Sequence, residues 1–214
     1  MAGGLFGATI MQGVRRGLFS NEAGEGSTPN AAAIAETSHP VKQGLLQALG
    51  VFIDTLVICT CTAMIILISG KYNCGDDGII LTSNALETEI GPAGKYFITA
   101  AIFLFAYSTI IANYFYGETN ILFITSSKKV LFAFRIATGI ILLSSAWFTL
   151  QEAWTVVDVM MGFLTICNIA AIVPLSKYAW RLLDDYMQQK KAGKEPTFNK
   201  SKMPDIQADI ECWD

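Results

Sequence analysis

Apolar residues fall into five long runs along this chain, separated by short polar loops and followed by a polar tail. Four of the runs are nearly free of charge, and each reaches the roughly 20 residues that a helix needs to cross the hydrocarbon of a bilayer. We predict membrane-spanning segments at about 3–27, 44–69, 96–124, 130–150 and 156–176. Residues 1–178 then form an all-α transmembrane bundle, and residues 179–214 form a tail with a short amphipathic start and a mostly irregular remainder.

The first run differs from the others because a polar stretch, Arg15 to Ser27, interrupts it with two arginines, two glutamates and three glycines. Such a stretch cannot cross lipid as an ordinary helix, since its charges and freed backbone groups would have no water to bind. It is tolerated where it lines a cavity. Non-helical backbone at membrane depth is typical of a transporter's substrate site.

Composition and charge support a membrane protein. Apolar residues make up 52% of the chain and charged residues 15%, against roughly 25% charged residues in soluble domains. The net charge of −3 comes from the loops and the tail, so it does not indicate nucleic-acid binding. Lysine and arginine cluster near Lys42, at 128–135 and in the tail, which predicts a cytoplasmic location for these parts, with the acidic loop 71–95 outside.

Among the carboxylates inside the predicted spans, Asp54 and Asp158 are candidates for a functional role. Asp54 stands alone in an apolar run, and its role is open between the ion pathway and a structural hydrogen bond to another helix. Asp158 is predicted near an interface. At that position, Asp158 is as plausibly a helix cap or a group in contact with water as a substrate-binding residue.

The third span carries Ser108 and Thr109, with Asn113 one turn later. Hydroxyl oxygens together with helix carbonyls are hard ligands of the kind that small cations need. The alternative is structural, because serine and threonine in membrane helices commonly donate to their own helix's carbonyl one turn back. The residues alone leave both open.

Several other kinds of site find no support. The five cysteines are scattered and His39 is the only histidine, so the sequence predicts no zinc site and no metal site other than a possible small-cation site at Ser108 and Thr109. It also contains no phosphate-binding glycine loop with its lysine, and no nucleophile beside a base. We therefore expect neither an enzyme nor an organic cofactor.

Five short motifs carry a resemblance that covers the chain up to the tail. They are Gly17-Leu-Phe-Ser-Asn-Glu-Ala-Gly-x-Gly-Ser, His39-Pro-Val-Lys-Gln-Gly, Val51-Phe-Ile-Asp-Thr, Phe105-Ala-Tyr-Ser-Thr-Ile and Tyr116-Gly-Glu. Together they resemble the sodium:alanine (amino acid:cation) symporter family, and they resemble only the C-terminal half of its members. The first motif is the most specific.

The resemblance implies a LeuT-type fold of the amino acid-polyamine-cation superfamily, in which two five-helix inverted repeats enclose a site near the midplane. This chain would be the second repeat, a transmembrane half-bundle with a discontinuous first helix. Ser108 and Thr109 would then bind the coupling sodium ion. The implied protein is a multi-pass secondary transporter of the bacterial inner membrane that carries alanine or glycine in symport with sodium.

Within that resemblance, the substrate candidates are residues of the interrupted segment and of the third span, namely Phe19, Ser20, Asn21, Ala23, Gly24, Thr109 and Asn113. Glu22 either belongs to the ion pathway or pairs with Arg15 or Arg16. The first repeat is missing, so we expect no transport by this chain alone, and a separately encoded N-terminal half is a possible partner. The alternative is a small accessory membrane protein that does not transport.

Overall fold

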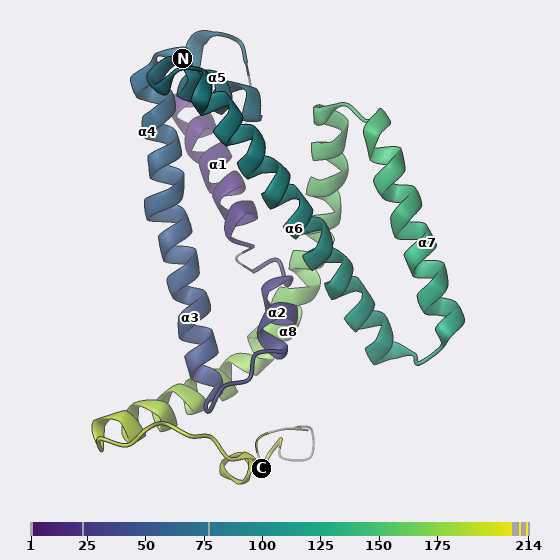
Figure 1. Ribbon diagram of the computed structural model, residues 1–214. Coiled ribbons are helices and arrows are strands. Elements are labelled where there is room, and N and C mark those ends of the chain that lie inside the picture. The colour runs from purple at the N-terminus through teal and green to yellow at the C-terminus, as the bar shows by residue number, and fades with distance from the viewer. Residues whose placement is uncertain (1, 23, 77, 207–209, 211–212, 214) are drawn as a thin grey trace. The chain divides into compact units, whose positions relative to one another are not determined.

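The computed structural model describes residues 2–22, 24–76, 78–206, 210 and 213, and within them it contains helices and no strands (Figure 1). A π-helical turn, Asp54–Ile58, joins α3 to α4, and single 3₁₀ turns lie at Lys71–Asn73, Ser145–Trp147 and Lys200–Lys202. The α-helices are α1 (Ala2–Asn21), α2 (Thr28–Ala33), α3 (Pro40–Ile53), α4 (Cys59–Ser69), α5 (Gly78–Ile90), α6 (Pro92–Ile124), α7 (Lys128–Ser144) and α8 (Leu150–Lys191).

Within the described residues, four helical stretches are long and apolar enough to cross a membrane: Pro40–Ser69, Pro92–Ile124, Lys128–Trp147 and Leu150–Lys191. They contain most of the four nearly uncharged runs, so the prediction of an all-α, multi-pass membrane protein is confirmed. Large apolar side chains are exposed along these helices, as on surfaces that lipid covers. A span at 3–27 stays a prediction, because α1 and α2 do not meet the same criteria.

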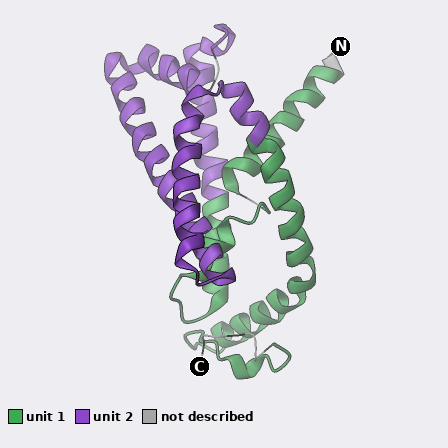
Figure 2. Cartoon of the chain, turned by 90° about the vertical axis from the view of Figure 1, so that its right-hand side faces the viewer, with its two compact units in different colours: residues 1–51, 157–214 green, residues 52–156 purple. Residues whose placement is uncertain are grey.

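The chain divides into two compact units, coloured separately in Figure 2. One consists of residues 1–51 with 157–214, and the other of residues 52–156. The first unit therefore joins the beginning of the chain to its end. The interrupted first segment and most of α8 belong to it.

In the second unit, α5 packs against α4 and α6. The sequence indicated only a loop between Lys71 and Lys95, so this helix was missed. Gly91, with φ of +74°, separates α5 from α6, and Pro92 begins α6. A Cβ atom at Gly94 would lie 2.8 Å from the Leu86 carbonyl oxygen, so the two helices approach too closely there for any side chain.

The helices α6 and α7 form an antiparallel hairpin in the same unit. The rings of Tyr114 and Phe134 stack with their centroids 5.8 Å apart. Beside them, Arg135 Nη2 donates to Glu118 Oε1 over 2.8 Å. A hydrogen-bonded pair of opposite charges is the arrangement in which such groups are tolerated in a membrane helix.

Helix α8 continues through the first part of the predicted tail to Lys191, and the irregular residues that follow pack against the rest of the first unit through apolar and aromatic side chains. Phe198 and Met203 are buried, and His39 has no exposed surface. The ring centroid of His39 lies 5.2 Å from that of Tyr186 on α8 and 5.7 Å from that of Phe198. The Phe198 amide also donates to the Ser38 carbonyl over 2.9 Å. The irregular tail is thus anchored between the start of α3 and the end of α8.

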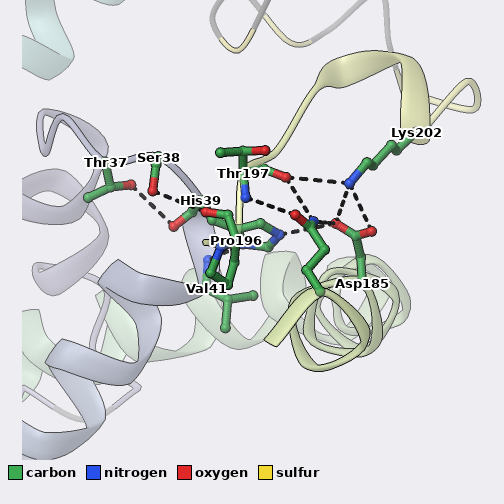
Figure 3. Close-up of polar contacts among 9 residues, drawn as sticks. Thr37, Ser38, His39, Val41, Asp185, Pro196, Thr197 and Lys202 are labelled. Atoms are coloured by element: carbon green, nitrogen blue, oxygen red, sulfur yellow. Dashed lines mark hydrogen bonds and ion pairs between the residues drawn. The ribbon is translucent and has the colours of Figure 1, made fainter. Parts of the chain in front are cut away.

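Charged groups complete the tail contact (Figure 3). Lys202 Nζ lies 2.9 Å from both oxygens of Asp185, and His39 Nε2 lies 3.3 Å from Asp185 Oδ2. Burial lowers the pKa of His39, against the opposing effect of Asp185. Outside this cluster, the hydrogen bond from Lys42 lowers the pKa of Glu195.

We predict that acidification weakens tail docking. His39 has a lowered pKa when docked, so the undocked state binds more protons below about pH 6.5, and docking loses stability as the pH falls. The lowered pKa of Glu195 acts in the same direction at lower pH. Hydrogen exchange at the Phe198 amide, corrected for its intrinsic pH dependence, should accelerate by up to about tenfold per pH unit below pH 6.5. His39→Gln should remove this dependence between about pH 6.5 and 5, and pH-independent protection in the parent chain would contradict the prediction.

Candidate functional site

The first segment is helical for longer than the sequence indicated. The polar stretch was expected to interrupt it from Arg15, but α1 continues through both arginines to Asn21. The physical reason is a carboxylate on α8. Arg15 contacts one oxygen of Asp158, and Arg16 Nη1 lies 3.4 Å from the other. With their charges balanced by Asp158, the arginines no longer require a break in the helix.

This ion pair corrects two predictions. Glu22 was a candidate partner for Arg15 or Arg16, but its carboxylate instead accepts a hydrogen bond from Ser27 Oγ over 2.5 Å. For Asp158, a helix cap or a water contact was as plausible as a role in substrate binding. It does not cap a helix, because it lies inside α8 and balances both arginines, and the substrate role stays a prediction. Glu22 as a group of the ion pathway stays a prediction.

The interruption itself runs from Glu22 to Ser27. Glu22, Gly24 and Gly26 have φ angles of +51°, +82° and +104°, so the backbone repeatedly enters the region that favours glycine. A short turn, in which the Glu25 amide donates to the Glu22 carbonyl over 3.2 Å, replaces the helical ladder. The helical path resumes at α2.

Asn168 of α8 lies directly against this interruption. Its Nδ2 donates to the Gly24 carbonyl oxygen over 3.0 Å. A Cβ atom at Gly26 would lie 3.0 Å from Asn168 Cβ, so a side chain there would force Asn168 to shift. Two features therefore favour glycine at position 26: its φ angle of +104° and the close approach of the Asn168 side chain.

Most of the predicted substrate residues in this unit gather at the interruption. Phe19, Ser20 and Asn21 form the last turn of α1, and Gly24 lies in the non-helical part. Asn21 Nδ2 donates to the Gly17 carbonyl over 2.8 Å, so its amide group is oriented by its own helix. Ala23 lies outside the described residues.

The predicted sodium ligands belong to the second unit. Ser108, Thr109 and Asn113 are exposed on α6, and Ser108 Oγ donates to the Phe105 carbonyl over 2.9 Å. This is the structural alternative that the sequence left open. This hydrogen bond does not exclude cation binding by Ser108, because a hydroxyl that donates its proton keeps oxygen lone pairs that can bind a cation.

Asp54 begins the π-helical turn Asp54–Ile58, and the Cys59 amide donates to the Asp54 carbonyl. Such turns occur frequently at functional sites. Whether Asp54 serves the ion pathway or a structural hydrogen bond stays open. In the described part of the chain, no three histidine, cysteine, aspartate or glutamate side chains come together as a metal site would require.

Sequence reasoning missed the partners that α8 supplies. Asn168 is a polar residue in an apolar run, which marks it as unusual, but nothing in the sequence pairs it with Gly24. Glu25 was treated as one of several polar residues in the interruption, yet it is almost completely buried. The repeated glycines on either side of Glu25 were the available signal.

Comparison with known proteins identifies the family. The sodium:alanine symporter family matches residues 1–200, and the chain belongs to this family. Its curated relatives are named as symporters, carriers and transporters, so this is a transporter family and not a family of enzymes. The resemblance drawn from the motifs is thereby confirmed.

Three relatives illustrate the similarity. The probable sodium/glutamine symporter GlnT of Bacillus subtilis is 51% identical over 99% of this chain and 44% of its own length. The amino-acid carrier protein AlsT of the same organism is 45% identical over 100% of this chain and 46% of its own length. The sodium/proton-dependent alanine carrier protein of Bacillus sp. strain PS3 is 37% identical over 94% of this chain and 49% of its own length.

The chain thus spans less than half the length of each of these three relatives. No solved structure matches it.

We predict that Asp158→Asn destabilises the chain more than Asp205→Asn, a matched control whose carboxylate pairs with Arg181. The Asp158 side chain is 20% exposed and that of Asp205 54%, so water compensates the loss less well at Asp158. The free energy of unfolding that Asp158→Asn loses should lie between the ~1 kcal/mol expected for an exposed ion pair and the ~3–5 kcal/mol expected when a buried pair is broken. Thermal unfolding in detergent measures both variants, and equal shifts in Tm would contradict the prediction.

Proposed function

We propose that this chain is the C-terminal half of a secondary transporter that carries a small neutral amino acid, alanine or glycine, together with sodium. The observation that carries the proposal is the helix interruption at Glu22–Ser27, held against α8 by Asn168. Interrupted helices supply backbone donors and acceptors to substrate and ion in inverted-repeat transporters. The names of the relatives, which include sodium symporters and alanine carriers, support the same function.

The order of elements supports a five-helix repeat of the LeuT type. The interrupted helix α1/α2, the helix α3/α4 with its π-turn, and α6, α7 and α8 supply five segments in sequence. The helix α5 is then an insertion between the second and third of them. In this arrangement the tail lies in the cytoplasm, and residues 71–95, which contain α5, lie outside the bacterial inner membrane.

The proposed substrate site combines backbone and side chains. Unwinding frees amides for the substrate carboxylate and carbonyls for its ammonium group. The residues assigned to the substrate are Phe19, Ser20, Asn21, Ala23, Gly24, Thr109 and Asn113. Ser108 and Thr109 contribute hydroxyl oxygens to sodium, which prefers such hard ligands.

Transport requires in addition the first repeat, either on one chain with these residues or separately encoded. In this fold the first repeat supplies the other side of the midplane site. The alternative of a non-transporting accessory protein is not favoured, because the family consists of transporters. Uptake by the isolated chain into vesicles under an inwardly directed sodium gradient would overturn the requirement for the first repeat.

The sodium assignment predicts a specific loss. When the chain is joined to the first repeat of a relative, Ser108→Ala with Thr109→Val should raise the sodium concentration for half-maximal uptake by about tenfold or more, since two oxygen ligands of a hard cation are lost. Thr99→Val is the control, because Thr99 also donates within α6, to the Lys95 carbonyl. An unchanged sodium response in the double variant would refute the assignment.

The substrate assignment predicts a different loss. Asn21→Ala should raise the amino-acid concentration for half-maximal uptake severalfold at saturating sodium, because it removes a polar group oriented at the interruption. Asn120→Ala is the matched control, because Asn120 Nδ2 makes the same bond to its own helix, at the Tyr116 carbonyl. Equal effects of the two variants on uptake would indicate that Asn21 has only a local structural role.

A further inference from the structure

Glu25 is a buried carboxylic acid at the centre of the helix interruption. The residue is 7% exposed and stands between Gly24 and Gly26, both of which have positive φ angles. Its Oε2 is buried, and no hydrogen-bond partner for it exists among the described residues. The roles proposed above for the interrupted segment do not use this side chain.

The groups around Glu25 do not balance a negative charge. Glu22, in the preceding turn, is itself acidic, and the Ser27 hydroxyl is donated to Glu22. Asn168 of α8, which donates to the Gly24 carbonyl, is uncharged. The nearest arginines along α1, Arg15 and Arg16, both contact Asp158. None of the ion pairs between described residues includes Glu25.

An ionised carboxylate in such surroundings is strongly disfavoured, since burial without donors removes its hydration and a like charge adds repulsion. A sodium ion would need several oxygen ligands around it, and the nearby Glu22 carboxylate is already bonded to Ser27. A proton needs only one oxygen and removes the charge directly.

We propose that the carboxyl group of Glu25 is a proton-binding site, occupied at neutral pH, and that it releases and rebinds this proton as the interrupted segment moves. The second part rests on the proposed transport function. The proton comes from water and returns to it, and no other bond changes.

The position of Glu25 explains how its proton would act on the substrate site. Its two neighbours in the chain, Gly24 and Gly26, are the residues that Asn168 contacts. A charged Glu25 would draw water or a cation into this packing, which favours an opened interruption. A neutral Glu25 fits the packed arrangement. Protonation therefore biases the same backbone that offers its amides and carbonyls to the amino acid.

Infrared difference spectroscopy of the purified chain tests the site without any transport assay. At neutral pH the parent should show the C=O band of a protonated carboxyl, with a small shift in heavy water. Glu25→Gln should abolish this band, whereas the matched variant Glu22→Gln should retain it. A band that survives in Glu25→Gln, or one that appears only near the ordinary glutamate range of about pH 4, would overturn the proposal.

A second measurement addresses transport, in the chain joined to the first repeat of a relative. Glu25→Gln should take up amino acid with little dependence on pH, while uptake by the parent should change severalfold with pH above the ordinary glutamate range, because burial raises the pH at which a carboxyl group loses its proton. Retention of the parent's pH profile by Glu25→Gln would refute proton exchange during transport. If Glu25→Gln loses the infrared band but the parent takes up no amino acid, the proton site is upheld and the proposed function is refuted.

Discussion

The contact between α8 and the interrupted first segment is the interaction on which the rest of the first unit depends. Two polar side chains of α8 provide it. Asp158 balances Arg15 and Arg16 on α1, and Asn168 fixes the Gly24 carbonyl beyond the end of that helix. The partners are more than 140 residues apart in sequence. They allow a segment with two arginines and two glutamates to pack beside an apolar helix.

The two contacts have different physical consequences. The ion pair compensates charges that would otherwise have to reach water, so α1 remains helical up to Asn21. The contact at Asn168 acts on backbone geometry, because it disfavours a side chain at position 26 and orients the Gly24 carbonyl. Together they separate the segment into a regular helix and a short non-helical part. In the proposed transporter, the non-helical part is where backbone groups are available to a ligand.

The sequence predicted the features that follow from local composition. The four long apolar runs correspond to four candidate membrane spans, and the glycine-rich polar stretch contains a helix interruption. The motifs led to the correct family. The short helix α5 was missed because its packing against α4 and α6 determines it, and the period of apolar residues around it is weak.

The partners of charged and polar residues were less predictable. Glu22 and the arginines are close in sequence and opposite in charge, which made them plausible partners, but Asp158 is reached from another helix. The burial of Glu25 and of His39 likewise depends on distant segments. Such pairings are properties of tertiary packing, and neither composition nor periodicity contains them.

A double-mutant cycle between α1 and α8 tests the central claim most directly. Arg15→Gln and Asp158→Asn should each destabilise the chain in detergent, and the double variant should lose less stability than the sum of the two by about 0.5 kcal/mol or more, because either change alone already breaks the pair. Arg15→Gln with Asp205→Asn, whose carboxylate contacts Arg181, should be additive. Additive effects in the first cycle, or equal coupling in both cycles, would contradict the account.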